Sequence, residues 1–200
     1  LIQSGWSGRG LEFAAKHADL IVIAKSQPLK IRQGLEDIWT QARARGRHAE
    51  DVKSLTVLRI VTAKTEIEAQ RKYDELQSNY HLQAQLVSYA GDTGIDISRY
   101  ADGDALSTHT EGMTSYVMRP DGSGTPLTAG DVKQRFANVT RGSDLILVGT
   151  PQQVADRIEE HARISGTHGY MLNPLISPGS LEDFVELVIP ELQKGGLYRT

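Results

Sequence analysis

The first ten residues, LIQSGWSGRG, have the residue types of an anion-binding turn. Two apolar residues precede a group of closely spaced small residues, which are Ser4, Gly5, Ser7, Gly8 and Gly10. Apolar residues then return at helical spacing, which predicts a strand, a tight turn and a helix start. Ser7 can cap this helix, Gly8 and Gly10 leave its first N–H groups clear of side chains, and Arg9 adds a positive charge. An anion would meet backbone donors and the positive end of the helix dipole there; the simpler alternative is a capped helix start that binds nothing.

Several sharper motifs are absent. A nucleophile elbow, G-x-S-x-G around Ser7, would need glycine at position 9, which is Arg9. The dinucleotide fingerprint G-x-G-x-x-G would need a third glycine where Phe13 stands. The sequence predicts no metal site either, because it has no cysteine and none of its six histidines shows H-x-x-x-H or H-E-x-x-H spacing.

The remaining polar candidates each have a simple structural explanation. His109, in the loop STHTEG, is the histidine best placed for an active-site contact, but a solvated loop side chain is the more common case. His17 and His161 fall on predicted helices as surface or packed residues. Three aspartates could suggest an acid pair or a calcium loop, but without EF-hand spacing they favour a solvated acidic turn: Asp96, Asp102 and Asp104.

The composition limits the class of protein. The 200 residues suffice for one domain with a sizeable core, and the formal net charge is −3, with 22 basic and 25 acidic residues. Since there is no long basic run, neither nucleic acid nor an anionic membrane surface is expected as a partner. No apolar stretch reaches the eighteen or so residues of a membrane span, and no signal peptide is visible. These features predict a soluble cytoplasmic protein.

Apolar runs and capping signals predict alternating strands and helices. After the opening strand, further strands are expected at residues 20–24, 55–61, 145–148 and 169–173. Helices are expected at 8–18, from Pro28 to a stop at Gly46, from a Thr65–Glu68 capping box through Leu76, and at 131–139. One face of the Pro28 helix should be buried, namely Ile31, Leu35, Ile38 and Ala42.

Two more helices complete the chain. Thr150 as N-cap, Pro151 in the first turn and Gln153 as its capping-box partner predict a helix that ends at Gly166. For the last helix we expect Ser180 to be the N-cap, Pro190 to kink the axis and Gly195 to end the helix.

Residues 81–128 interrupt the alternation and read as mostly loop with possible short helices. The order is therefore βα, βα, βα with a long insertion, then βα, which predicts a parallel sheet with right-handed crossovers. Four such units make half of an eight-stranded β/α barrel with open edges. Because Leu1 is not methionine and already lies in an apolar run, we expect a fragment whose preceding strands are missing.

Trp6 would lie against a ligand ring or close the end of the barrel.

Three separated segments carry a family resemblance: QSGWSGRGLEFAAKHAD, VGTPQQVADRI and DFVELVIPELQKGGLYR. They resemble the bacterial luciferase-like flavin monooxygenases, especially the subgroup of nitrilotriacetate and dibenzothiophene-sulfone monooxygenases, over essentially all 200 residues. The resemblance implies an α/β fold in which residues 1–200 form a partial domain. This domain would be the C-terminal half of a (β/α)8 TIM barrel, with the insertion at about 81–128 following its third strand.

The resemblance also implies site residues. The family's Q-A-G-S-S turn binds the FMN phosphate and matches residues 3–7 of this chain, departing from the pattern at Ser4 and Trp6. Ser7 would contact the phosphate, and Gly5 and Gly8 would allow its close approach. We assign no catalytic residue, since the family places those groups mostly on its first four strands. The insertion is expected to lie over the substrate pocket and to set substrate preference.

The implied activity is that of a two-component monooxygenase that uses reduced FMN and O2 on a small organic substrate. Resemblance further implies a separate NAD(P)H:flavin reductase as a partner and a homo-oligomer, and we expect the 200-residue chain alone to be inactive. Two alternatives stay open: a non-catalytic flavin-binding or assembly half-barrel, and a deazaflavin-dependent barrel oxidoreductase with the same phosphate turn.

Overall fold

The computed structural model describes residues 1–107, 114–119, 123–137 and 145–200. These residues form two compact units, each described here by itself: Leu1–Glu75 with Ser143–Thr200, and Leu76–Gly142. His109 lies outside the described residues. None of the described helices is long and apolar enough to cross a membrane.

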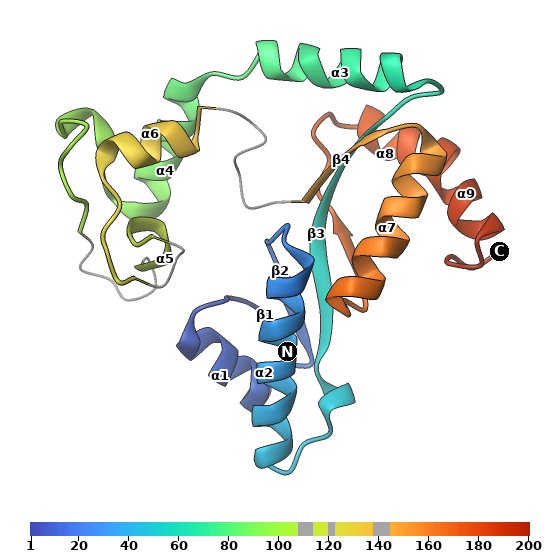
Figure 1. Cartoon of the computed structure of the whole chain (residues 1–200), viewed down its shortest axis with the longest axis horizontal. Helices are drawn as coiled ribbons and strands as arrows, with labels where there is room; N and C mark the ends of the chain where they lie inside the picture. The colour runs from blue at the N-terminus through green and yellow to red at the C-terminus, as the bar shows by residue number, and fades with distance from the viewer. Residues whose placement is uncertain (108–113, 120–122, 138–144) are drawn as a thin grey trace. The chain divides into compact units, whose positions relative to one another are not determined.

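The first unit is built on a parallel sheet with β3 at its centre (Figure 1). The strands are β1 (Ile2–Ser4), β2 (Leu20–Ile23), β3 (Lys53–Thr62), β4 (Leu145–Gly149) and β5 (Gly169–Leu172). β1 pairs with β2, and the long β3 pairs with β2, β4 and β5, always in parallel. The predicted parallel α/β sheet is therefore confirmed. β3 is longer than predicted because different parts of it serve different neighbours.

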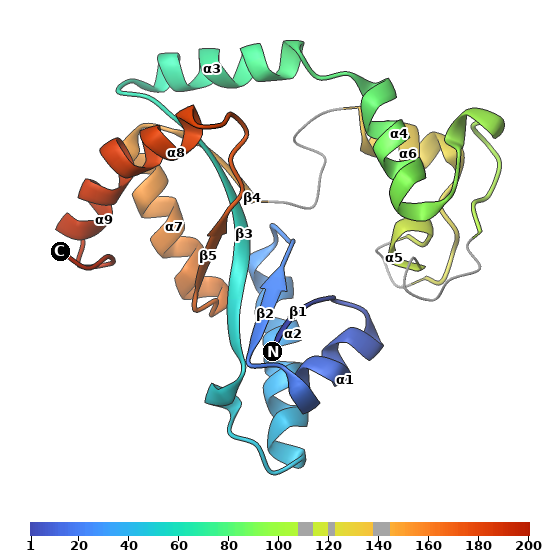
Figure 2. The same cartoon turned by 180° about the vertical axis from the view of Figure 1, so that it is seen from behind.

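Helices cover one face of this sheet. They are α1 (Gly8–His17), α2 (Pro28–Ala44), α7 (Pro151–Ser165), α8 (Gly179–Asp183) and α9 (Ile189–Lys194). The short 3-10 helix η1 (Ala49–Asp51) precedes β3 in the chain, and α3 (Glu66–Ser78) follows the end of β3. Seen from behind, β2 and β5 lie in front of α2 and α7, so these two helices share a face of the sheet (Figure 2). Alternate strand residues point into the helix layer, as Ile21 and Ile23 do against α1 and α2, and Leu58 and Ile60 against α7.

Local signals in the sequence placed several helices correctly. The predicted face of α2 (Ile31, Leu35, Ile38 and Ala42) is fully buried. Pro28 opens that helix, as proline can at a position where the N–H has no intrahelical partner. At α7 the predicted capping box is complete: the Gln153 amide donates to Thr150 Oγ1 over 3.3 Å, and the Thr150 amide donates to Gln153 Oε1 over 2.9 Å.

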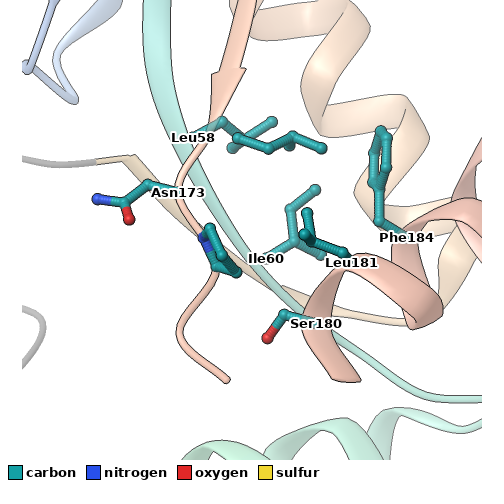
Figure 3. Close-up of a pocket in the computed structure, with 8 residues that line it drawn as sticks. Leu58, Ile60, Asn173, Ser180, Leu181 and Phe184 are labelled. Atoms are coloured by element: carbon teal, nitrogen blue, oxygen red, sulfur yellow. The ribbon is translucent and has the colours of Figure 1, made fainter. Parts of the chain in front are cut away.

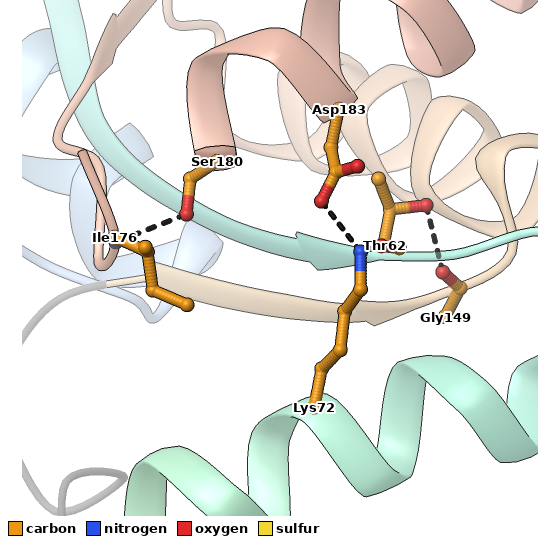
Figure 4. A network of polar contacts seen from close by, with 6 residues as sticks. All are labelled: Thr62, Lys72, Gly149, Ile176, Ser180 and Asp183. Carbon is orange, nitrogen blue, oxygen red and sulfur yellow. Dashed lines mark hydrogen bonds and ion pairs between the residues drawn. The ribbon is translucent and has the colours of Figure 1, made fainter. Parts of the chain in front are cut away.

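The last helix differs from expectation at its start. Ser180 is not the N-cap, because α8 begins one residue earlier, at Gly179. Its hydroxyl accepts instead from the amide of Ile176, 3.1 Å away (Figure 4). The predicted kink at Pro190 takes the form of a π-helical segment, η5 (Phe184–Val188), between α8 and α9. Proline cannot donate to the preceding turn, and the wider π turn accommodates that missing bond.

The second unit has its own small core. Its helices are α4 (Leu82–Thr93), η2 (Ile97–Arg99), α5 (Thr114–Val117) and α6 (Ala129–Arg135). Its buried cluster comprises Tyr89, Ile95, Ile97, Leu106, Val117, Leu127, Ala129 and Val132. The expectation of a mostly irregular segment is wrong for residues 82–93, where α4 includes Gly91 and ends at Gly94 in the left-handed conformation. Gly91 is thus a residue of the helix, and Gly94 is its C-cap.

Candidate functional site

The opening turn has the predicted strand–turn–helix form. β1 ends at Ser4 and α1 begins at Gly8, with Ser7 as the N-cap in extended conformation. Ser7 Oγ accepts from the amide of Gly10 over 3.1 Å, and the Ser7 carbonyl accepts from the amide of Leu11 over 2.9 Å. The predicted cap is confirmed. The Gly10 amide is not available to a ligand, in contrast to the expectation from the sequence.

The outer side of the turn is open. Ser7 and Gly8 are exposed, and a Cβ placed on Gly8 would meet no atom within 4 Å. A serine hydroxyl that accepts one hydrogen bond still has its own hydrogen to donate. Together with the positive end of the α1 dipole, the exposed hydroxyl and the open Gly8 backbone suit a phosphate group.

Gly5 faces the inside of the turn. A Cβ on Gly5 would lie 2.9 Å from Nε2 of Gln3, and one on Gly10 would lie 3.0 Å from the carbonyl carbon of Gly5. At these distances a side chain would need the carboxamide of Gln3 or the backbone of Gly5 to shift. Gly5 therefore allows the chain to fold tightly on itself, and the approach of a phosphate at Gly5 stays a prediction.

Trp6 belongs to the packing beneath the turn. It is partly buried and packs against the cluster of β2, α1 and α2, as Leu11 and Trp39 also do. A Cβ built on Gly34 of α2 would lie 2.2 Å from Cζ2 of the indole. Of the two alternatives for Trp6, the structure favours the packing role, and the indole does not fill the open space beside Gly8.

The three aspartates of the second unit each serve a local contact. Asp96 caps η2 by accepting from the amide of Ser98 over 3.0 Å, and bonds from Ser98 hold the pKa of Asp96 below its usual value. Asp102 pairs with Lys133, and Asp104 accepts from the amide of Ala101. Within the described part of the chain no three potential metal ligands gather at one point.

Polar contacts that the sequence did not predict lie between α7 and β5. His161 is 6% exposed, and its Nδ1 lies 2.9 Å from the hydroxyl of Tyr170, which donates to the carbonyl of Ile158 over 2.9 Å. Since the tyrosine hydrogen is committed to that carbonyl, Nδ1 must carry the hydrogen of the imidazole. Burial lowers the pKa of His161 and raises that of Tyr170. No local pattern reveals such a pair, because it depends on packing α7 against β5.

His168, just before β5, meets the beginning of β3. Its Nδ1 accepts from the amide of Ser54 over 3.2 Å and lies 3.0 Å from the Ser54 hydroxyl. Partial burial, and then the charge of Lys53, lower the pKa of this histidine. These contacts are at the amino-terminal end of the strands, which in β/α barrels serves stability, whereas the active site is at the other end.

A small hollow with a free volume of about 10 Å³ lies between β3, β5 and α8 (Figure 3). Its lining is mostly apolar: Leu58, Ile60, Leu172, Asn173, Pro174, Ser180, Leu181 and Phe184. Figure 3 shows the carboxamide of Asn173 directed away from the apolar side chains. That volume has room for about one water molecule and is far below the roughly 300 Å³ at which small-molecule pockets begin. We interpret this cavity as a packing gap in the helix layer.

Comparison with known proteins extends these observations. Residues 1–168 match the family described as Luciferase-like monooxygenase. The chain is 31% identical over 199 residues to the long-chain alkane monooxygenase of Geobacillus thermodenitrificans, covering all of this chain and 41% of that protein. It is 28% identical over 206 residues to nitrilotriacetate monooxygenase component A of Aminobacter aminovorans, covering all of this chain and 45% of that protein.

A solved structure agrees with the sequence relatives. The riboflavin lyase RcaE, determined with modified FMN and the substrate riboflavin, superposes with a TM-score of 0.85 and 32% identity, covering all of this chain and 44% of that one. The chain thus spans less than half the length of each of these relatives. The predicted family resemblance is confirmed: the chain belongs to the luciferase-like monooxygenase family, with part of that family's barrel fold.

Proposed function

We propose that the protein is a two-component monooxygenase that uses reduced FMN and O2 to oxidise a small organic compound. The observation that carries this proposal is the family match over residues 1–168, which includes the open, hydroxyl-capped start of α1. The reductase partner, a homo-oligomeric state and a partial barrel domain at 1–200 are part of the same proposal.

The residues of the turn fit the phosphate of FMN. Ser7 keeps Oγ as an acceptor for the Gly10 amide and can donate its hydrogen to a phosphate oxygen. Gly8 leaves the backbone open beside it, and Gly5 keeps the turn compact. Bound reduced flavin would supply the electrons for oxygen activation. The turn itself would bind and orient the cofactor through its phosphate end.

The test compares FMN with riboflavin, which lacks the phosphate. Binding is measured by flavin fluorescence for the wild type and for Ser7→Ala. We expect the wild type to prefer FMN, and the substitution to weaken FMN binding about tenfold, or roughly 1.4 kcal/mol, while riboflavin binding stays the same. Equal affinity of the wild type for the two flavins would contradict the proposal.

Thr150→Ala provides the matched control. Thr150 is the N-cap of α7, and its hydroxyl accepts from an N3 amide just as Ser7 does. Both substitutions remove one cap and cost about 1 kcal/mol of stability. Only Ser7→Ala should change FMN affinity; a similar loss in Thr150→Ala would show that helix fraying, and not the lost phosphate contact, causes the effect.

We further propose that the segment at about 81–128 sets substrate preference. Its support is its position between α3 and β4 and its independent core. Exchanging this segment between relatives should transfer substrate preference, measured by product formation from a panel of substrates. Unchanged preference would refute this part of the proposal. The isolated 200-residue chain, assayed with reduced FMN and O2, should form no product.

A further inference from the structure

Gln3 connects the strand to the helix across the opening turn. It is the middle residue of β1, and its Nε2 donates to the carbonyl of Gly10 over 3.0 Å. Gly10 lies in the first turn of α1, and its amide donates to Ser7 Oγ, so this amide is not available to a ligand. One carboxamide therefore fixes the first turn of the helix relative to the end of the strand.

The turn is folded closely around this carboxamide. Nε2 of Gln3 would lie 2.9 Å from a Cβ on Gly5 and 3.3 Å from a Cβ on Gly10. Glycine at both positions leaves the space that the carboxamide occupies. The path of the backbone from Gly5 to Gly10 is thus shaped by the side chain of Gln3, which lies inside it.

The oxygen atom of the Gln3 carboxamide, Oε1, indicates that this side chain has a role besides stabilising the fold. Oε1 is buried and has no hydrogen-bond partner among the described residues. Turning the amide over would place Oε1 against the Gly10 carbonyl, two acceptors facing each other, so chemistry fixes the observed orientation. An unpartnered buried acceptor is unfavourable. For stability alone, methionine would fill the same space without an unpartnered acceptor.

We propose that Gln3 is a positioning residue of the phosphate turn. It touches no ligand; it holds the start of α1 at the spacing that lets the Ser7 hydroxyl and the open backbone at Gly8 converge on one phosphate. This inference rests on the proposed function, since it assumes that the turn binds the phosphate of FMN.

The experiment measures FMN and riboflavin affinity together with the melting temperature. In Gln3→Met the bond to Gly10 is lost, but the unpartnered Oε1 is lost as well, so stability should change little. FMN affinity should fall about tenfold, with riboflavin affinity within about twofold of the wild type. Gln3→Glu keeps the side-chain length, but the ionised carboxylate cannot donate to the Gly10 carbonyl, so this change should weaken FMN binding further. Gln33→Met, on the exposed side of α2, is the control and should bind both flavins normally.

The outcomes separate the two proposals. If the wild type does not prefer FMN over riboflavin, the proposed function fails and this inference fails with it. If the wild type prefers FMN and Gln3→Met binds it equally well, only the role of Gln3 is refuted. Loss of riboflavin and FMN binding in equal measure also refutes it. Should Gln3→Met not fold, Gln3→Asn, whose amide is one methylene too short to reach Gly10, tests the same expectation.

Discussion

The indole of Trp6 lies directly on Gly34 of α2, so close that a Cβ at position 34 would be 2.2 Å from Cζ2 of the indole. Trp6 is part of the opening turn, and Gly34 is fully within α2. The contact attaches the turn to the second helix and anchors it from beneath. A glycine in the middle of a helix usually destabilises the helix, but at position 34 it leaves the space that the indole of Trp6 occupies.

This contact reverses the usual effect of a glycine substitution in a helix. Gly34→Ala should destabilise the first unit, because the new methyl group displaces Trp6, whereas glycine to alanine in an open helix position stabilises by roughly 0.5–1 kcal/mol. Thermal unfolding followed by far-ultraviolet circular dichroism, which reports the helices of both units, measures the change. Gly91→Ala in α4 is the control, since a Cβ there meets nothing within 4 Å.

The double variant Trp6→Leu with Gly34→Ala completes this test. Leucine is small enough to leave room for the new methyl group, so the two changes together should cost less than the sum of the single ones. If Gly34→Ala proves as stabilising as Gly91→Ala, the indole does not hold the observed position.

Arg47 caps the end of α1 from the chain segment that follows α2. Its guanidinium donates to the carbonyls of Ala15 over 3.0 Å and of Ala18 over 2.8 Å, where the helix dipole is negative. Arg47→Ala should lower the free energy of unfolding by about 2 kcal/mol, measured by urea denaturation. Arg43→Ala, which removes an exposed arginine of α2 that donates to the Thr40 hydroxyl, should change the free energy of unfolding by less than about 0.5 kcal/mol. Equal effects would show that the capping bonds contribute nothing.

Lys72 joins α3 to the end of β3 and to α8 (Figure 4). Its Nζ donates to the Thr62 carbonyl over 3.1 Å and to Asp183 over 2.7 Å. Both side chains of the ion pair are about one-third exposed, so water screens their attraction. Lys72→Met should therefore cost at most about 1 kcal/mol, and less at high salt.

Lys194→Met is the control for Lys72. Lys194 pairs with Glu191 on the same helix and is 71% exposed. Its removal should leave the melting temperature nearly unchanged, because exposed pairs of this kind contribute little. A loss in Lys72→Met that persists undiminished at 1 M salt would mean that the bond to the Thr62 carbonyl, and not the ion pair, is responsible.

How far the sequence predicted this structure depends on how local each signal is. The Thr150–Gln153 capping box joins residues three apart, so the sequence predicts it directly. The buried face of α2 is predicted for the same reason, since helix geometry fixes which residues share a face. The prediction of Ser180 as the N-cap was wrong because a serine near a helix start can accept from a preceding amide as well as from a following one. α4 was missed because Gly91 lowers helix propensity without preventing the helix.

The candidate site was predicted in part for the same reason. Ser7 as a cap is a local feature, and the structure confirms it. Three other contacts join residues that approach each other only when the elements pack. They are the bond from Gln3 to Gly10, the contact of Trp6 with Gly34 and the His161–Tyr170 pair. No spacing rule in a single sequence identifies such contacts.

The buried His161 makes stability depend on pH. Its pKa in the folded protein lies below the unfolded value of about 6.5 because burial disfavours the charged ring. Above that pH the imidazole is neutral in both states and contributes no pH dependence. As the pH falls below about 6.5, His161 binds a proton in the unfolded chain more readily than in the folded protein, so the free energy of unfolding falls. One such group contributes a slope of at most about 1.4 kcal/mol per pH unit.

Urea denaturation between pH 7 and pH 5 measures this slope. His161→Gln keeps a side chain of similar volume that can still donate to Tyr170, and it removes the titrating ring. The loss of stability on acidification should therefore be smaller than in the wild type. Gln33→Asn, at an exposed position on α2, changes no ionisable group and should leave the slope as it is. If both variants retain the wild-type slope, then the ring of His161 takes up its proton in the folded state as readily as in the unfolded one, and its burial against Tyr170 has no influence on folding.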